Sequence, residues 1–158
     1  MLFRSAGLLY QEIQQLDEIW LDASQERLTE ATLLTELERS VGYDGFIHHF
    51  KNYVLRRDPS YLEVASDGHE RAMALVDDLA ETELGREHPQ RTDDLKKTLR
   101  EYGRALTTAY QPQSADMTPS ELDELVRVSD SAAAEALAHL RKAAGNISRD
   151  VKIGRAHV

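Results

Sequence analysis

Residues 9–23, LYQEIQQLDEIWLDA, decide the fold class, because their apolar side chains recur at intervals of three and four. The series consists of Leu9, Ile13, Leu16, Trp20 and Ala23. Gln, Asp and Glu residues lie between them. This spacing places one apolar stripe along an amphipathic helix, and we expect the stripe to be buried. Leu33, Leu37 and Val41 continue the same helix.

Interruptions of this periodicity predict where the helices end. Gly42 and Gly45 lie close enough together to break the first helix near residues 42–45, since glycine weakens a helix or permits a bend. Residues 46–56 resume the helical pattern. Asp58 is a candidate N-cap, and Pro59 follows it at the first position of a new helix, where proline is favoured. This helix carries apolar residues from Leu62 to Leu79.

The second half of the chain follows the same pattern. A turn near residues 85–89 precedes a helix whose apolar positions run from Leu95 to Ala109. Thr118 and Glu121 have the spacing of a capping box at the start of a short extra helix near 119–127. The last helix follows Ser129-Asp130. We therefore predict an all-α fold, a four-helix bundle with up-down connectivity whose two ends lie together.

Both ends of the chain match translated sequencing adapter. Residues 1–5, MLFRS, and residues 152–158, KIGRAHV, correspond to opposite strands of one common adapter. We interpret residues 6–151 as a single domain cut from a longer protein, because such a length supports one hydrophobic core. In that segment 16 basic residues face 28 acidic ones. This charge argues against nucleic-acid binding, and the absence of cysteine excludes disulfides and thiolate metal sites.

One stretch differs in composition from the rest of the acidic chain. Residues 45–57 contain no acid, but they hold two His, one Lys and two Arg. On a helix, Phe46, Phe50 and Tyr53 form an apolar face. His48, Asn52 and Arg56 follow one another at steps of four along another flank, with Lys51 beside them. These side chains are hydrogen-bond donors, so we expect a small anionic ligand there. The alternative is a solvated face whose cations pair with acids elsewhere.

Residues 42–56, GYDGFIHHFKNYVLR, resemble the GYGGFIHNFKNYVLR signature of extracytoplasmic helical sensor domains in bacterial transmembrane signalling proteins, with 13 of 15 positions in agreement. Those domains lie between two membrane spans, ahead of chemoreceptor, histidine-kinase or diguanylate-cyclase output modules. The resemblance therefore implies a ligand-sensing periplasmic domain of an inner-membrane protein. Residues 121–137 resemble a later motif of that family, in which two Asp residues precede the last helix. Ser129 replaces the first of them.

The resemblance implies a set of ligand-binding residues: Tyr43, His48, Lys51, Asn52, Arg56 and Asp130. Asp44 departs from the signature, where Gly stands, and adds a negative charge near the proposed site. His49 replaces Asn and is left out of the set. We expect no cofactor and no metal. A homodimer is compatible with the ligand-sensing role.

Three other functions are alternatives to ligand sensing: an enzyme, a metal- or haem-binding bundle and a protein-interaction module. No Gly-rich phosphate loop, nucleophile elbow or His-Glu-x-x-His motif is present, so we predict no enzyme. A metal- or haem-binding bundle would have to use His48 with acids from another helix, since adjacent His48 and His49 point about 100° apart. His69 lies on an apolar stripe and is more typical of a hydrogen-bonded structural histidine. A helical protein-interaction module would use the same polar stripe to contact a partner.

Overall fold

The computed structural model describes the backbone of residues 2–42 and 44–156 and the side chains of residues 7–42 and 44–146. Within these ranges all regular structure is helical and no strand occurs, which confirms the predicted all-α class. The elements are α1 (Leu2–Val41), α2 (Phe46–Arg56), α3 (Pro59–Glu81), α4 (Glu83–Glu87), α5 (Pro89–Ala109), the 3₁₀ turn η1 (Pro112–Ser114), α6 (Pro119–Leu125) and α7 (Ser131–Ala156).

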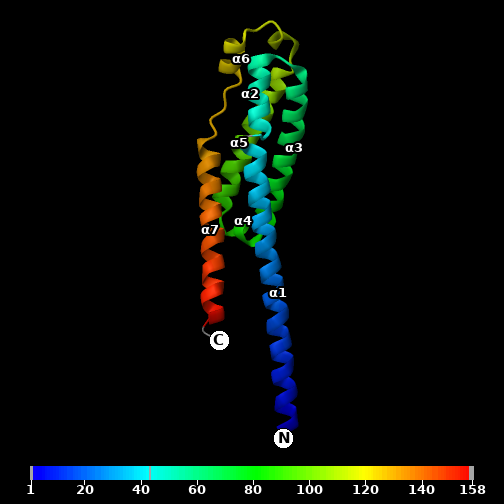
Figure 1. Cartoon of the computed structure of the whole chain (residues 1–158), viewed down its shortest axis with the longest axis vertical. Coiled ribbons are helices and arrows are strands. Elements are labelled where there is room, and N and C mark those ends of the chain that lie inside the picture. Colours follow the sequence, from blue (N-terminus) through cyan, green and yellow to red (C-terminus); the bar gives the residue numbers. More distant parts are fainter. Residues whose placement is uncertain (1, 43, 157–158) are drawn as a thin grey trace.

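The long helices lie side by side and share one core (Figure 1). Helix α3 packs on α1 and α5, and α7 packs on α5 and α1, while α2 packs on α3 and α6. Helix α1 begins, and α7 ends, at the same end of the molecule, where both termini lie (Figure 1). The turns between α2 and α3 and from α5 to α6 lie at the opposite end.

The predicted break between the first two helices is confirmed, and close backbone packing explains its glycines. Helix α1 ends at Val41 and α2 begins at Phe46. A Cβ atom on Gly45 would lie 2.1 Å from the backbone oxygen of Ser40, and one on Gly42 would lie 2.7 Å from that of Glu38. Neither glycine has a positive φ. A side chain is therefore excluded at both positions by lack of space rather than by backbone conformation.

Two predicted helix starts are also confirmed. The Asp58 carboxylate accepts a hydrogen bond of 3.0 Å from the backbone N–H of Ser60 at the start of α3. The Thr118 and Glu121 side chains form the reciprocal capping box at the start of α6. Each cap satisfies backbone N–H groups that have no partner inside the helix. These local signals fix where α3 and α6 begin.

The first half of α1 departs from expectation. Its apolar stripe is exposed rather than buried: Leu9 is 59 %, Ile13 55 %, Leu16 54 % and Trp20 45 % exposed. This part of α1 extends beyond the other helices (Figure 1). Only the second half of α1 enters the core, through Leu34 and Leu37. The periodicity correctly indicated an amphipathic helix, but no other described segment covers its first half.

Two glutamates attach α1 to the short helix α4. Glu30 is 3 % exposed and accepts a hydrogen bond of 2.9 Å from the backbone N–H of Leu84. Glu26 accepts one of 3.0 Å from the backbone N–H of Glu83. Carboxylates at a helix N-terminus satisfy its free N–H groups and complement the helix dipole. Burial nevertheless raises the pKa of Glu30, against the lowering effect of the Leu84 N–H.

Candidate functional site

Helix α2 has one buried face, which sets the direction of its polar residues. The buried residues are Phe46, Ile47, Phe50 and Val54. Phe46 packs edge-on against His69 of α3 and Tyr102 of α5, with ring centroids 5.5 and 5.3 Å away. The predicted burial of Phe46 and Phe50 is confirmed. Tyr53 is only partly buried, and its hydroxyl donates a hydrogen bond of 3.4 Å to the carbonyl of Ala109.

The other flank of α2 carries the polar stripe predicted from the sequence. His48 and Asn52 are half-buried, while Lys51 and Arg56 are exposed. Arg56 donates a hydrogen bond of 3.3 Å to the hydroxyl of Tyr61 in α3, and its guanidinium lies 5.8 Å from the centre of that ring. The predicted Tyr43 lies outside the described residues. The stripe is therefore present, and Arg56 at its end contacts α3.

His49, the residue left out of the predicted set, lies against α3. Its ring stacks on Tyr61 with centroids 6.2 Å apart and contacts His48 edge-on at 6.1 Å. Its Nδ1 atom is buried, and no described residue is its hydrogen-bond partner. The bond that Tyr61 accepts from Arg56 places Arg56 and His49 around the same tyrosine. His49 thus joins the α2–α3 contact.

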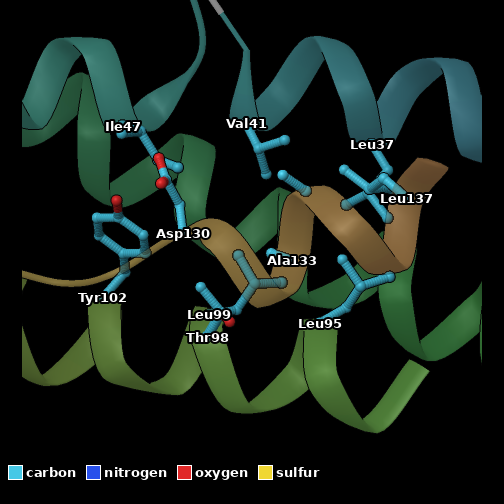
Figure 2. A pocket seen from close by; sticks show the side chains of 11 residues that line it. Leu37, Val41, Ile47, Leu95, Thr98, Leu99, Tyr102, Asp130, Ala133 and Leu137 are labelled. Atoms are coloured by element: carbon cyan, nitrogen blue, oxygen red, sulfur yellow. The ribbon is translucent and has the colours of Figure 1, made fainter. Parts of the chain in front are cut away.

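Asp130 is exposed and lies at a different place, beside a partly open cavity of about 140 Å³ between α1, α2, α5 and α7 (Figure 2). The lining residues are Leu37, Val41, Ile47, Leu95, Thr98, Leu99, Tyr102, Asp130, Ala133, Ala134 and Leu137. Asp130 directly precedes α7, and its carbonyl accepts the hydrogen bond of Ala134 N–H at 2.9 Å. The cavity wall therefore combines residues from four helices.

The cavity has an apolar end and a polar end. In Figure 2, Asp130 and Tyr102 lie toward the Ile47 end, whereas Leu95 and Leu137 lie at the other. The third polar lining residue, Thr98, donates its hydroxyl to the carbonyl of Asp94 at 3.1 Å. Within the described part of the chain, neither the Tyr102 hydroxyl nor the Asp130 carboxylate has a hydrogen-bond partner. Burial, helped by the negative charge of Asp130, raises the pKa of Tyr102 to about 12.

The structure does not bring the predicted set together in one site. Ile47 lines the cavity with Asp130, and Arg56 follows it nine residues later on α2. At a rise of 1.5 Å per residue, Arg56 lies about 13 Å farther along the helix axis. His48, Lys51 and Asn52 are also not among the lining residues. Asp130 borders the cavity, whereas Arg56 lies outside its lining.

Arg57, which the sequence analysis did not single out, has a structural role. It ends α2 with φ of 59° and donates to the carbonyls of Ser114 and Met117, in the segment that joins η1 to α6. Its guanidinium also lies 5.7 Å from the ring centre of Tyr53. One further guanidinium nitrogen is buried, and no described residue accepts from it. The only sequence signal was its position beside Arg56.

The other described histidines do not line the cavity. His69 is hydrogen-bonded at 2.7 Å to the carbonyl of Leu99, in agreement with its predicted structural role. His88 and His139 face each other with ring centroids 5.0 Å apart. Desolvation and the positive charges of Arg91, His88 and Lys142 lower the pKa of His139. No group of three or more metal-ligating side chains occurs among the described residues.

Among its described residues the chain has no helix long and apolar enough to cross a membrane. Comparison of the sequence and structure with protein-family models, curated proteins and solved structures gives no match.

Proposed function

We propose that this chain is the ligand-sensing extracytoplasmic domain of a bacterial transmembrane signalling protein, and that the ligand occupies the cavity beside Asp130. The observation that carries the proposal is the composition of the cavity wall. Leu37 and Val41 belong to α1, and Ala133 and Leu137 belong to α7. Helix α1 begins, and α7 ends, at the same end of the molecule (Figure 1). A ligand in the cavity would touch both of them at once.

The architecture of the proposed sensor is an up-down four-helix bundle formed by α1, α3, α5 and α7. Each of these helices packs on two of the others, and short elements occupy the connections. Helices α2 and α6 are then additions to the bundle at the end opposite the termini. In such a bundle the first and last helices are antiparallel neighbours. This arrangement suits a domain inserted between two membrane spans, with the domain in the periplasm and its parent in the inner membrane.

The signalling step is a change in how α1 lies against α7. Arg141 of α7 forms a forked pair with Glu38 of α1, with N–O distances of 3.1 and 2.9 Å, and also donates to Thr35. This pair lies near the cavity-lining residue Leu37 in the sequence of α1. A ligand shifts the arrangement only if it binds one position of the helices better than another. The break between α1 and α2 lets the two helices move separately.

Binding rather than catalysis fits the polar groups of the cavity. A phenol with a pKa of about 12 keeps its proton at neutral pH. Tyr102 therefore offers a ligand a neutral hydroxyl, which can donate or accept a hydrogen bond, and does not act as a base. Asp130 supplies a charge that orients a ligand.

A second copy of the chain is the proposed partner for the exposed stripe of α1. Leu9, Ile13, Leu16 and Trp20 have the alternating spacing of four and three that forms a coiled-coil seam. The spacing continues through Ala23 toward the buried residues of the same helix. If both copies are anchored in one membrane, their α1 helices run parallel, an arrangement that this seam allows.

The parent gene tests the sensor assignment directly. Sequencing outward from the codons of Ala6 and Val151 in the source DNA should reveal an apolar span of about 20 residues on each side and a cytoplasmic signalling module on one. Flanks without such spans would contradict the membrane-sensor assignment.

A further inference from the structure

We propose that the cavity beside Asp130 selects a small organic cation, an ammonium group on a compact apolar body. This inference rests on the proposed ligand-sensing function, which it makes specific. It departs from the anion that the stripe on α2 predicts, because the stripe and the cavity are separate places in the structure. Three properties of the cavity favour such a ligand: its size, the distribution of its polar groups and the sign of its charge.

The size of the cavity limits the ligand to about one ring. Its volume is about 140 Å³. An engineered apolar cavity of about 150 Å³ in another protein stays dry and binds benzene. The lining at the far end consists of Leu37, Leu95 and Leu137 (Figure 2). A phenyl ring or a branched alkyl group of similar size would fill this end and leave its polar group toward Asp130.

The polar end of the cavity favours a cationic donor. The Asp130 carboxylate accepts hydrogen bonds only, and no described residue donates one to it. Tyr102 supplies a hydroxyl that accepts a second N–H bond beside it (Figure 2). An ammonium group offers three donors and a positive charge, so it suits both oxygens.

The same end disfavours an anion. No Lys, Arg or His is among the residues that line the cavity. A carboxylate or phosphate there would face the charge of Asp130 without a counterion. A neutral ligand of the same shape would keep the ring contacts and gain no ion pair. For ligands of the same shape, we therefore expect a cation to bind most tightly, a neutral molecule less tightly and an anion most weakly.

Three ligands with the same ring test this order: benzylamine, benzyl alcohol and benzoate, each titrated by heteronuclear NMR and thermal melting into the full 158-residue chain. We expect benzylamine to bind about tenfold more tightly than benzyl alcohol, the ratio for a charge-assisted hydrogen bond of about 1.4 kcal/mol. Benzoate should bind most weakly. Asp130→Asn should remove the preference for benzylamine while the protein stays folded, because Asn has nearly the same size and the exposed Asp130 carboxylate makes no hydrogen bond to a described residue. Asp93→Asn, an exposed carboxylate on α5 outside the cavity, is the matched control and should retain it.

The other outcomes separate the two proposals. Equal affinity for all three ligands, or an unchanged preference in Asp130→Asn, would overturn the cationic class and leave ligand binding in place. Tighter binding of benzoate, abolished by Arg56→Ala, would overturn it in favour of the stripe on α2. If none of the three ligands, and no inorganic phosphate, shifts the melting midpoint or the resonances of cavity residues at millimolar concentration, the proposed sensing function fails as well.

Discussion

A Cβ atom on Gly68 of α3 would lie 2.7 Å from the Cβ of Phe46 in α2, so the two helices meet at a point where only glycine fits. Phe46 is 2 % exposed and contacts the rings of His69 and Tyr102. It therefore has no room to move away from a new methyl group. This contact fixes the position of α2, and of its polar stripe, along the axis of α3.

Overpacking a core costs about 1–3 kcal/mol, and Ala gains about 1 kcal/mol over Gly inside a helix. Gly68→Ala should therefore lower the free energy of unfolding by up to about 2 kcal/mol. Gly145→Ala on α7 is the matched control, since a Cβ there meets nothing within 4 Å. It should be neutral or stabilising in urea denaturation. A stabilised Gly68→Ala protein would show that α2 does not pack on α3 in this register.

Arg57 and Arg56 are neighbours with different roles, and the difference is measurable. Arg57→Ala removes the hydrogen bonds to the carbonyls of Ser114 and Met117 and should cost about 1–3 kcal/mol of stability. Arg56→Ala removes an exposed contact with Tyr61 and should change stability by less than about 0.5 kcal/mol. Chemical denaturation of both variants checks this. Equal effects would contradict the structural role of Arg57.

Glu30 is predicted to destabilise the fold through its charge and to stabilise it through its hydrogen bond. Burial, with the negative charges of Glu26 and Glu83, raises the pKa of Glu30. The stability that this shift contributes is present below the unfolded pKa near 4.5 and is lost as the pH rises through the higher folded value. Gln keeps an acceptor for the Leu84 N–H and carries no charge.

Glu30→Gln should therefore be more stable than the parent at pH 7, and the advantage should disappear at pH values below the unfolded pKa. Glu30→Ala leaves the Leu84 N–H without its acceptor and should lose about 1–3 kcal/mol below the unfolded pKa, and less at pH 7, where it also removes the buried charge. Urea denaturation from pH 3 to pH 8 separates the two effects. A Gln variant that is less stable at neutral pH would mean that the charge itself is needed at the start of α4.

Local signals predicted much of the fold, and contacts between distant residues account for what was missed. Asp58 and Thr118 were found because a cap acts within three residues of itself. The stripe from Leu9 to Trp20 was found as helical, but periodicity shows which face is apolar and not what covers it. The sequence predicted Tyr102 only as one of the apolar positions of its helix, because its cavity also needs Asp130, which directly precedes another helix.

The pKa of Tyr102 depends in part on the negative charge of Asp130. Because the folded pKa of about 12 exceeds the unfolded value of about 10, the stability from Tyr102 is complete below pH 10 and is lost as the pH rises through 12. Asp130→Asn removes a negative charge and should lower the pKa of Tyr102. The tyrosinate absorbance of each protein, minus that of the same protein with Tyr102→Phe, measures this. An unchanged pKa would place the carboxylate too far away to contact a shared ligand.

The exposed stripe of α1 predicts self-association with an unusual salt dependence. Replacing Ile13 with Glu places a charge in the seam and should weaken dimerisation in sedimentation equilibrium. Leu21→Glu is the matched control, because Leu21 is 62 % exposed on the same helix but lies outside the 4–3 spacing.

Residues 7–26 carry five acids and no Lys or Arg, so two parallel α1 helices repel each other. Added salt screens this repulsion and should strengthen the dimer, since the Debye length falls from about 10 Å at 0.1 M to about 3 Å at 1 M. A monomer at every salt concentration, or equal effects of the two Glu variants, would show that the stripe is not covered by a second copy.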